Sequence, residues 1–257
     1  MKKLVLIGDS WGCGEYKHVG NGSIALNHPG MQEYLPYKTV NISVGGASNW
    51  DILYSMFNYM NQSQHLDQTY SIIVFQTDPM RTSFADKFDV DIDEQIQKAS
   101  SIEQLYLDLV DIFYIKISNF SKQFNVPVYI IGALSDVDDH TFSLYNNKKN
   151  IICNSWLSLL YKDHVPSVIP LPLDSKTLTI FKKAGRTDLC EQLLDINDNN
   201  FIEFNKILGL ETMGPAFGDF HPSRLGHKVL TEHIINFVDK KERKYIKRLT
   251  NTVKSVY

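Results

Sequence analysis

Short apolar runs of strand length alternate with longer segments of helical periodicity along the first half of the chain. The strand-like runs cover residues 3–8, 37–44, 70–78 and 127–132, and turn residues or polar residues follow each. Between them, segments 47–60 and 93–124 carry apolar residues at helical spacing. Such unbroken apolar strands are typical of a parallel sheet with both faces buried. We therefore predict an α/β fold, a three-layer α/β/α sandwich with a mainly parallel central sheet.

The second half of the chain is less regular. Residues 164–173 contain three prolines, which favour an edge strand or an extended loop. Residues 175–210 resemble two or three short helices with polar joints such as "DINDNN", and the final helix is expected to begin at Pro222 or Ser223. We expect one domain over residues 1–240, with 135–215 as an insertion or lid, followed by a basic helical tail over 241–257.

The composition excludes several classes of protein. The 257 residues are 43% hydrophobic, enough for a substantial core, and the net charge of −3 gives no general attraction to nucleic acid. The opening apolar run is too short for a signal peptide and Asp9 interrupts it, so we expect a cytoplasmic protein without stable membrane insertion. Three widely spaced cysteines indicate neither a disulfide framework nor a metal site, and we expect no cofactor.

Polar or small residues follow three of the expected strands. Ligands of open parallel sheets bind beyond the carboxyl ends of the strands, and a histidine, His221, comes just before the last helix. A hydroxyl nucleophile needs a base to take its proton, and the base needs an orienting group. Ser10, His221 and Asp219 are candidates for these roles. The strand ends concerned are 8–10, 45–46 and 76–78.

Four short blocks resemble the SGNH/GDSL hydrolases, a family of serine esterases and lipases. These blocks are "GDSW", "NISVGGAS", "FQTDPMR" and "DFHPSRLGH". The resemblance implies a flavodoxin-like sheet and the hydrolysis of esters through an acyl-enzyme. It offers Ser10 as nucleophile and His221 as general base. It also offers the backbone N–H groups of Ser10 and Gly46 as an oxyanion hole, Gly46 standing five residues after Asn41.

Two positions depart from the family pattern. The family's acid stands three residues before the histidine, where this chain has Gly218, and Asp219 is only two residues upstream. A triad completed by Asp219 and a dyad oriented by a backbone carbonyl both remain open. The family's oxyanion-hole asparagine falls on Asp78, and an ionised carboxylate cannot donate a hydrogen bond.

Three solutions to the missing donor are open. Asp78 is protonated, or Gln76 or Thr77 donates instead, or the hole consists of the backbone N–H groups alone. Cys13 lies near enough to Ser10 to be a rival nucleophile, although a small buried thiol is its commoner role.

The substrate-binding side chains expected around this centre are Asp9, Trp11, Asn49 and Arg81, with a surface salt bridge as the alternative for Arg81. "DVDIDE" at 89–94 lacks the glycine and distal glutamate of a calcium loop, so we interpret it as a helix start capped by Asp93.

The sequence favours an esterase acting on a small-molecule or glycan ester, with a carbohydrate O-acetyl or other acyl group slightly preferred. The alternative is a glycan-binding module whose catalysis is weakened at Asp78. The oligomeric state is not indicated by the sequence.

Overall fold

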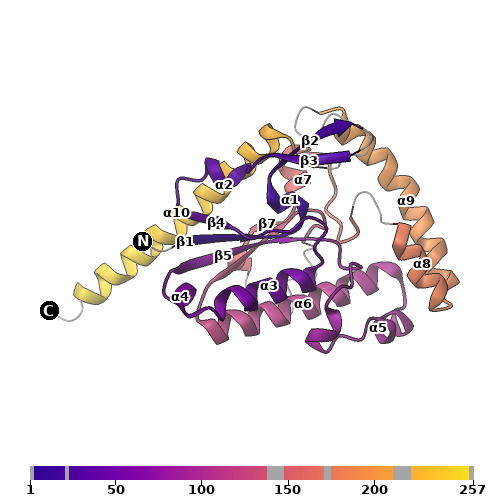
Figure 1. Cartoon of the computed structure of the whole chain (residues 1–257), viewed down its shortest axis with the longest axis horizontal. Coiled ribbons are helices and arrows are strands. Elements are labelled where there is room, and N and C mark those ends of the chain that lie inside the picture. Colours follow the sequence, from indigo (N-terminus) through magenta and orange to yellow (C-terminus); the bar gives the residue numbers. More distant parts are fainter. Residues whose placement is uncertain (1–2, 21–22, 138–147, 171–174, 211–220, 255–257) are drawn as a thin grey trace.

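A computed structural model describes residues 3–20, 23–137, 148–170, 175–210 and 221–254 of the chain (Figure 1). Its central sheet has five strands in the order β4-β1-β5-β6-β7, and all neighbouring strands are parallel. Counted along the chain within this sheet, the order is 2-1-3-4-5, that of flavodoxin-like folds. The predicted α/β fold is confirmed. The strands are β1 (Lys3–Ile7), β4 (Thr39–Asn41), β5 (Thr69–Gln76), β6 (Val128–Gly132) and β7 (Ile151–Cys153).

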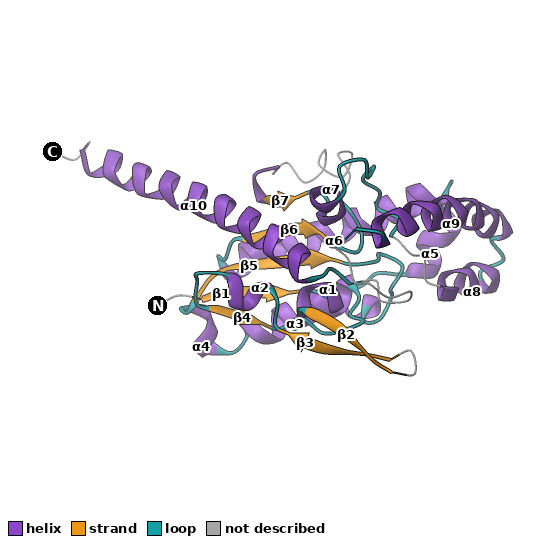
Figure 2. Cartoon of the chain, turned by 90° about the horizontal axis from the view of Figure 1, so that it is seen from above, coloured by secondary structure: helices purple, strands orange, loops and turns teal. Residues whose placement is uncertain are grey.

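Helices cover both faces of this sheet (Figures 1 and 2). Helices α3 (Asn49–Met60) and α6 (Ile102–Phe124) pack on one face, where they share a core with Val5 and Ile7. Helices α2 (Met31–Tyr34), α7 (Trp156–Leu160) and α10 (Arg224–Lys254) pack on the other, with Leu4 and Leu6. Successive residues of β1 thus enter opposite cores, as the two-residue period of a strand requires.

The remaining elements are short or lie outside the central sheet. Strands β2 (Glu15–Gly20) and β3 (Ser23–His28) form a separate antiparallel hairpin. Helices α8 (Ser175–Lys183) and α9 (Thr187–Leu208) pack together on the side of the molecule opposite the C-terminus (Figure 1). The other elements are α1 (Ser10–Cys13), α4 (Ser63–Leu66), η1 (Ala85–Phe88), α5 (Ile92–Lys98) and η3 (Lys148–Asn150).

Side-chain caps fix where several helices begin. Ser48 caps α3 in a capping box: its hydroxyl accepts from the N–H of Asp51 at 2.9 Å, and the Asp51 carboxylate accepts from the N–H of Ser48 at 2.8 Å. The expected helix over 93–124 is divided, because Ser101 starts α6 as a new N-cap. Asp91 rather than Asp93 caps α5, since its side chain accepts from the N–H of Glu94.

The second half of the chain differs most from the expectations. The fifth strand is β7, whereas the described part of 164–173 contains no strand, in keeping with the missing N–H groups of Pro166 and Pro170. Segment "DINDNN" lies inside α9, a single helix of 22 residues. Tertiary packing overrides the low helix propensity of this segment, because Leu193 and Phe204 of α9 are buried in the two cores.

The last helix, α10, begins at Arg224 instead of Pro222 or Ser223, and it runs as one helix past residue 240. Among the described residues, no helix is both long and apolar enough to cross a membrane.

Candidate active site

The loop that carries Ser10 connects β1 to the one-turn helix α1. Asp9 is fully buried, and its Oδ1 accepts from the N–H of Trp11 at 2.9 Å, so that its side chain caps α1. A Cβ atom on Gly8 would lie 2.5 Å from the Cβ of Phe75, which excludes any larger residue there without a shift. These constraints place Ser10 at the carboxyl edge of the sheet, as the first residue of α1.

The second oxygen of Asp9 ties three loops together. Its Oδ2 accepts from Thr77 Oγ1 at 2.7 Å and from Arg81 Nη1 at 3.1 Å. The same Nη1 donates to the carbonyl of Ala47 at 3.3 Å. The buried carboxylate is therefore balanced by a guanidinium, and the Ser10 loop is held against the loops that follow β4 and β5.

The loop after β4 lies against Ser10. A Cβ atom placed on Gly45 would be 4.0 Å from the Cβ of Ser10. Gly46 has a φ of 76°, in the left-handed region that favours glycine, and a Cβ there would meet nothing within 4 Å. Asn41 locks this loop to α1, because its Nδ2 donates to the carbonyl of Gly12 at 2.8 Å. The structure thus brings Ser10 and the two glycines together.

Gln76 and Thr77, at the end of β5, have their side-chain donors engaged in the scaffold. The amide Nε2 of Gln76 donates to Ser135 Oγ at 2.9 Å and to the carbonyl of Asp136 at 2.8 Å. The hydroxyl of Thr77 donates to Asp9, and its backbone N–H donates to Asn49 Oδ1 at 3.0 Å. The side-chain donors of Gln76 and Thr77 are therefore already bonded to other groups of the protein.

Asp78 is buried beside them, only 2% exposed. Its Oδ1 accepts from the N–H of Met80 at 2.9 Å. When ionised, it only accepts hydrogen bonds and cannot supply the donor that an asparagine would supply at this place, whereas the protonated acid can donate one.

His221 lies at the same edge of the sheet, where its ring packs against Tyr16, a residue of β2 that the sequence analysis did not single out. The ring centroids of His221 and Tyr16 are 4.3 Å apart, with an interplanar angle of 32°. The hydroxyl of Tyr16 lies 3.6 Å from the Cβ position on Gly45, the same position that lies 4.0 Å from Ser10 Cβ. Nucleophile candidate, glycine loop and imidazole therefore gather around one tyrosine. Asp219 lies outside the described residues, as does Gly218.

Cys13 is half-buried next to this group. Burial raises the pKa of its thiol, the nearby Asp9 raises it further, and a hydrogen bond with Tyr16 opposes them. A raised pKa disfavours the thiolate, the form in which cysteine acts as a nucleophile.

Three of the four expected substrate-binding side chains are buried in the scaffold. Trp11 is 2% exposed and packs edge-on against Trp156 at 5.6 Å, and Asn49 is 1% exposed. Asp9 is described above. The side chain of Arg81 pairs with Asp9 and is 26% exposed, so part of it remains accessible to solvent. Binding of substrate by these residues stays a prediction.

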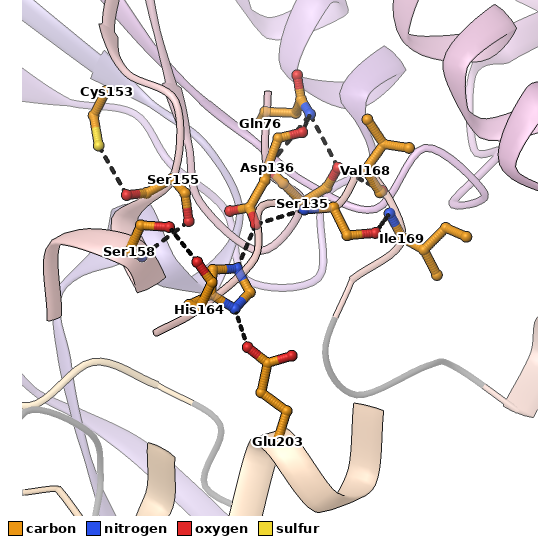
Figure 3. A network of polar contacts seen from close by, with 11 residues as sticks. Gln76, Ser135, Asp136, Cys153, Ser155, Ser158, His164, Val168, Ile169 and Glu203 are labelled. Atoms are coloured by element: carbon orange, nitrogen blue, oxygen red, sulfur yellow. Dashed lines mark hydrogen bonds and ion pairs between the residues drawn. The ribbon is translucent and has the colours of Figure 1, made fainter. Parts of the chain in front are cut away.

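A second polar cluster lies beyond the end of β6 (Figure 3). His164, 6% exposed, lies between two carboxylates: its Nε2 is 2.6 Å from Asp136 Oδ2, and its Nδ1 contacts Glu203 of α9. Burial lowers the pKa of His164, but hydrogen bonds and charge from the two carboxylates outweigh it and raise the pKa overall. These contacts span 28 and 39 residues, and no periodicity or motif in the sequence signals them.

A cavity of about 400 Å³ adjoins the glycine loop. Gly45 and Gly46 form part of its wall, and Tyr54 and Phe84 lie among its other lining residues. The two rings stack 4.9 Å apart at an angle of 19°, and each residue is 40% exposed. An exposed aromatic pair therefore flanks the loop next to Ser10.

No protein-family model and no curated protein sequence matches the chain. Among solved structures, similarity extends to an acetyl xylan esterase, AlAXEase, at 13% identity and a TM-score of 0.41, covering 91% of this chain and 98% of that one. The lipase Lip_vut3 from a goat rumen metagenome is similar at 12% identity and a TM-score of 0.45, covering 92% and 97%. Likenesses this distant carry no argument about the chemistry of the site.

Proposed function

We propose that this protein is a serine hydrolase of the SGNH/GDSL type that cleaves carboxylic esters through an acyl-enzyme. The observation that carries the proposal is the gathering of Ser10, the Gly45–Gly46 loop and His221 at one edge of the sheet, around Tyr16. A hydroxyl, an imidazole and backbone N–H groups are the parts that acyl transfer requires.

The mechanism follows from these parts. Ser10 Oγ attacks the ester carbonyl while His221 takes its proton, and the oxyanion forms against the N–H groups of Ser10 and Gly46. His221 then protonates the departing alcohol. A water molecule, deprotonated by His221, attacks the acyl-enzyme and releases the acid. Asp219 orients His221 in the triad version of this scheme, and a backbone carbonyl does so in the dyad version.

For the substrate we favour an O-acetyl or other O-acyl group on a carbohydrate. The stacked Tyr54 and Phe84 support this choice, because partly exposed aromatic side chains beside a polar centre offer apolar surface to a sugar ring. The second candidate function is a glycan-binding module that uses the same cleft without turnover. It is favoured by one observation: Asp78 accepts a hydrogen bond from the N–H of Met80 where the expected oxyanion hole calls for a donor.

Labelling with a fluorophosphonate separates the two functions. The hydrolase forms a covalent adduct at Ser10 that disappears in Ser10→Ala, while Ser55→Ala, a serine of the adjacent cavity, keeps the label. Turnover of p-nitrophenyl acetate falls by about 10³-fold or more in Ser10→Ala and in His221→Ala. A folded wild-type protein that takes no label, hydrolyses no ester and binds glycan would establish the module instead.

A further inference from the structure

The oxyanion hole proposed above has two backbone donors, and its third position is occupied by a side chain that accepts. Asp78 stands where an asparagine would donate, and the donors of Gln76 and Thr77 bind Ser135, Asp136 and Asp9. Neither neighbour is free to replace the missing group. With Asp78 ionised, a third side-chain donor has to come from another element.

Tyr16 is placed to do so. Its hydroxyl and the Cβ of Ser10 lie 3.6 and 4.0 Å from one point, the Cβ position on Gly45, so Tyr16 and Ser10 lie next to the same glycine. Gly46, the expected backbone donor, is the next residue. The ring of Tyr16 packs on His221 at 4.3 Å, which fixes its direction.

The hairpin that carries Tyr16 is anchored by the two residues just before it. Gly14, with a φ of 140°, makes the sharp turn from α1 into β2, and a Cβ there would lie 2.3 Å from the carbonyl oxygen of His28. The next residue, Glu15, is 5% exposed, and its carboxylate accepts from Tyr34 Oη and from Arg224 Nε, the latter at 3.1 Å. Tyr16 is thus held in place by its neighbour, which is tied to α2 and α10.

The phenol of Tyr16 is a donor over the whole useful pH range. Burial raises its pKa, and the neighbouring Cys13 and Asp9 raise it further, so the hydroxyl stays protonated at neutral and mildly alkaline pH. The hydrogen bond between Cys13 and Tyr16 uses the weak thiol as partner. An oxyanion is a far stronger acceptor than a thiol, so the phenol proton can turn to it when charge develops.

We propose that Tyr16 is a catalytic residue whose hydroxyl donates to the oxyanion the hydrogen bond that Asp78 cannot donate, an inference that rests on the proposed function. As the bond between Ser10 Oγ and the carbonyl carbon forms, the carbonyl π pair moves onto oxygen. Tyr16 stabilises this charge without giving up its proton. When the intermediate collapses, the pair returns to the carbonyl, the carbon–oxygen bond to the alcohol breaks, and the leaving oxygen takes its proton from His221.

Tyr16→Phe is the decisive variant, because it removes the hydroxyl and keeps the ring that packs on His221. We expect kcat for p-nitrophenyl acetate to fall about 100-fold with KM changed less than about threefold, as for the loss of one oxyanion donor. Inhibition by phenylboronic acid, whose tetrahedral adduct carries the oxyanion, weakens by a similar factor. Tyr37→Phe is the matched control: it removes a hydroxyl that donates to Asp239 at 2.9 Å, and its kinetics stay those of the wild type.

Asp78→Asn supplies the rescue. The amide oxygen can still accept from the N–H of Met80, and the amide nitrogen adds a donor. In the Tyr16→Phe background this change recovers kcat at least about tenfold, because it restores a side-chain donor to the hole.

The outcomes separate this inference from the proposed function. If Ser10→Ala abolishes turnover and labelling while Tyr16→Phe keeps wild-type kcat and boronate affinity, the role of Tyr16 is overturned and the hydrolase stands. A fall in kcat without any weakening of boronate inhibition also overturns it, because it assigns Tyr16 to positioning His221. Full turnover in Ser10→Ala removes the hydrolase itself.

Discussion

Two buried histidines lie in different regions of the molecule, and their pKa values are shifted in opposite directions. One lies beside the helical arm, which we define as α8 and α9, and the other lies behind the edge that holds Ser10. His164 joins the arm to the sheet between the carboxylates of Asp136 and Glu203, and its pKa is raised. His227 of α10 is 0% exposed behind the Ser10 edge, with its ring 5.2 Å from that of Trp156. Burial lowers the pKa of His227 to about 4.

The two regions therefore respond to pH with opposite signs. Folding favours protonated His164, so its contribution is complete below pH 6.5 and is lost as the pH rises through the raised pKa. Folding favours neutral His227, so burial of this imidazole does not lower the free energy of unfolding above pH 6.5. As the pH falls from 6.5 toward about 4, the unfolded state binds the proton more readily and the protein is destabilised. Mild acid therefore retains the stabilising contacts of His164 with the helical arm, whereas it destabilises the region around His227 behind Ser10.

The largest expected effect is that of His164→Leu. Without the imidazolium, the carboxylate of Asp136, which is 2% exposed, is left buried without its cation, and we expect the free energy of unfolding at pH 6 to fall by about 4 kcal/mol. Urea denaturation measures the loss, and amide hydrogen exchange locates it in α9.

His233→Leu is the matched control for this comparison. Nε2 of His233 lies 2.9 Å from a single neutral acceptor, the carbonyl of Ile152, so its replacement costs about 1 kcal/mol. Equal losses in the two variants, or exchange that stays unchanged in α9, would contradict the role given to His164.

The next effect is a change in pH dependence in His227→Leu. Besides burial, the groups acting on His227 in the wild type are Glu15 and the backbone of Gly14, which favour protonation, and His221 and His28, which oppose it. The variant has no imidazole whose protonation favours unfolding. Its free energy of unfolding therefore rises by about 3 kcal/mol relative to that of the wild type as the pH is lowered from 6.5 to 4. Thermal unfolding at four or five pH values measures the gain. A constant difference between the two proteins across this range would disprove it.

The smallest effect is expected for Glu203→Gln. The side chain of Glu203 is 27% exposed, and a glutamine oxygen can still accept from Nδ1 of His164, so the loss at pH 6 is about 1 kcal/mol. Asp136→Asn gives the sharper comparison, because Asp136 is buried and its Oδ2 also accepts from the N–H of Ser167 at 3.0 Å. A larger loss from Glu203→Gln than from Asp136→Asn would reverse the order of the two carboxylates in this cluster.

The central sheet was predictable because its long strands are apolar on both faces. Strands β1 and β6 fall within the expected segments, and β5 begins one residue before its expected segment. Hairpin β2–β3 was missed, since Lys17, Val19 and Leu26 are exposed and give no alternating buried face. Strand β7 has only three residues, too few for a pattern.

The candidate site was predictable only where a local motif marked it. Sequence motifs pointed to Ser10, Gly46 and His221, whereas no motif pointed to Tyr16, the residue beside which Ser10 and His221 lie. Tyr16 reaches them from the hairpin, and its partner His221 comes from the other end of the chain. The contacts of His164 likewise depend on how α9 folds back onto the sheet, which no local pattern encodes.

Hairpin β2–β3 has one further consequence. Within the described residues its strands pair only with each other, and it projects from the body beside the central sheet (Figure 2). Its length and sequence can therefore change by mutation without shifting any register of the five-stranded sheet. Evolution or directed selection can vary its exposed residues, such as Lys17, Val19 and Leu26, while Glu15 keeps the hairpin tied to α2 and α10.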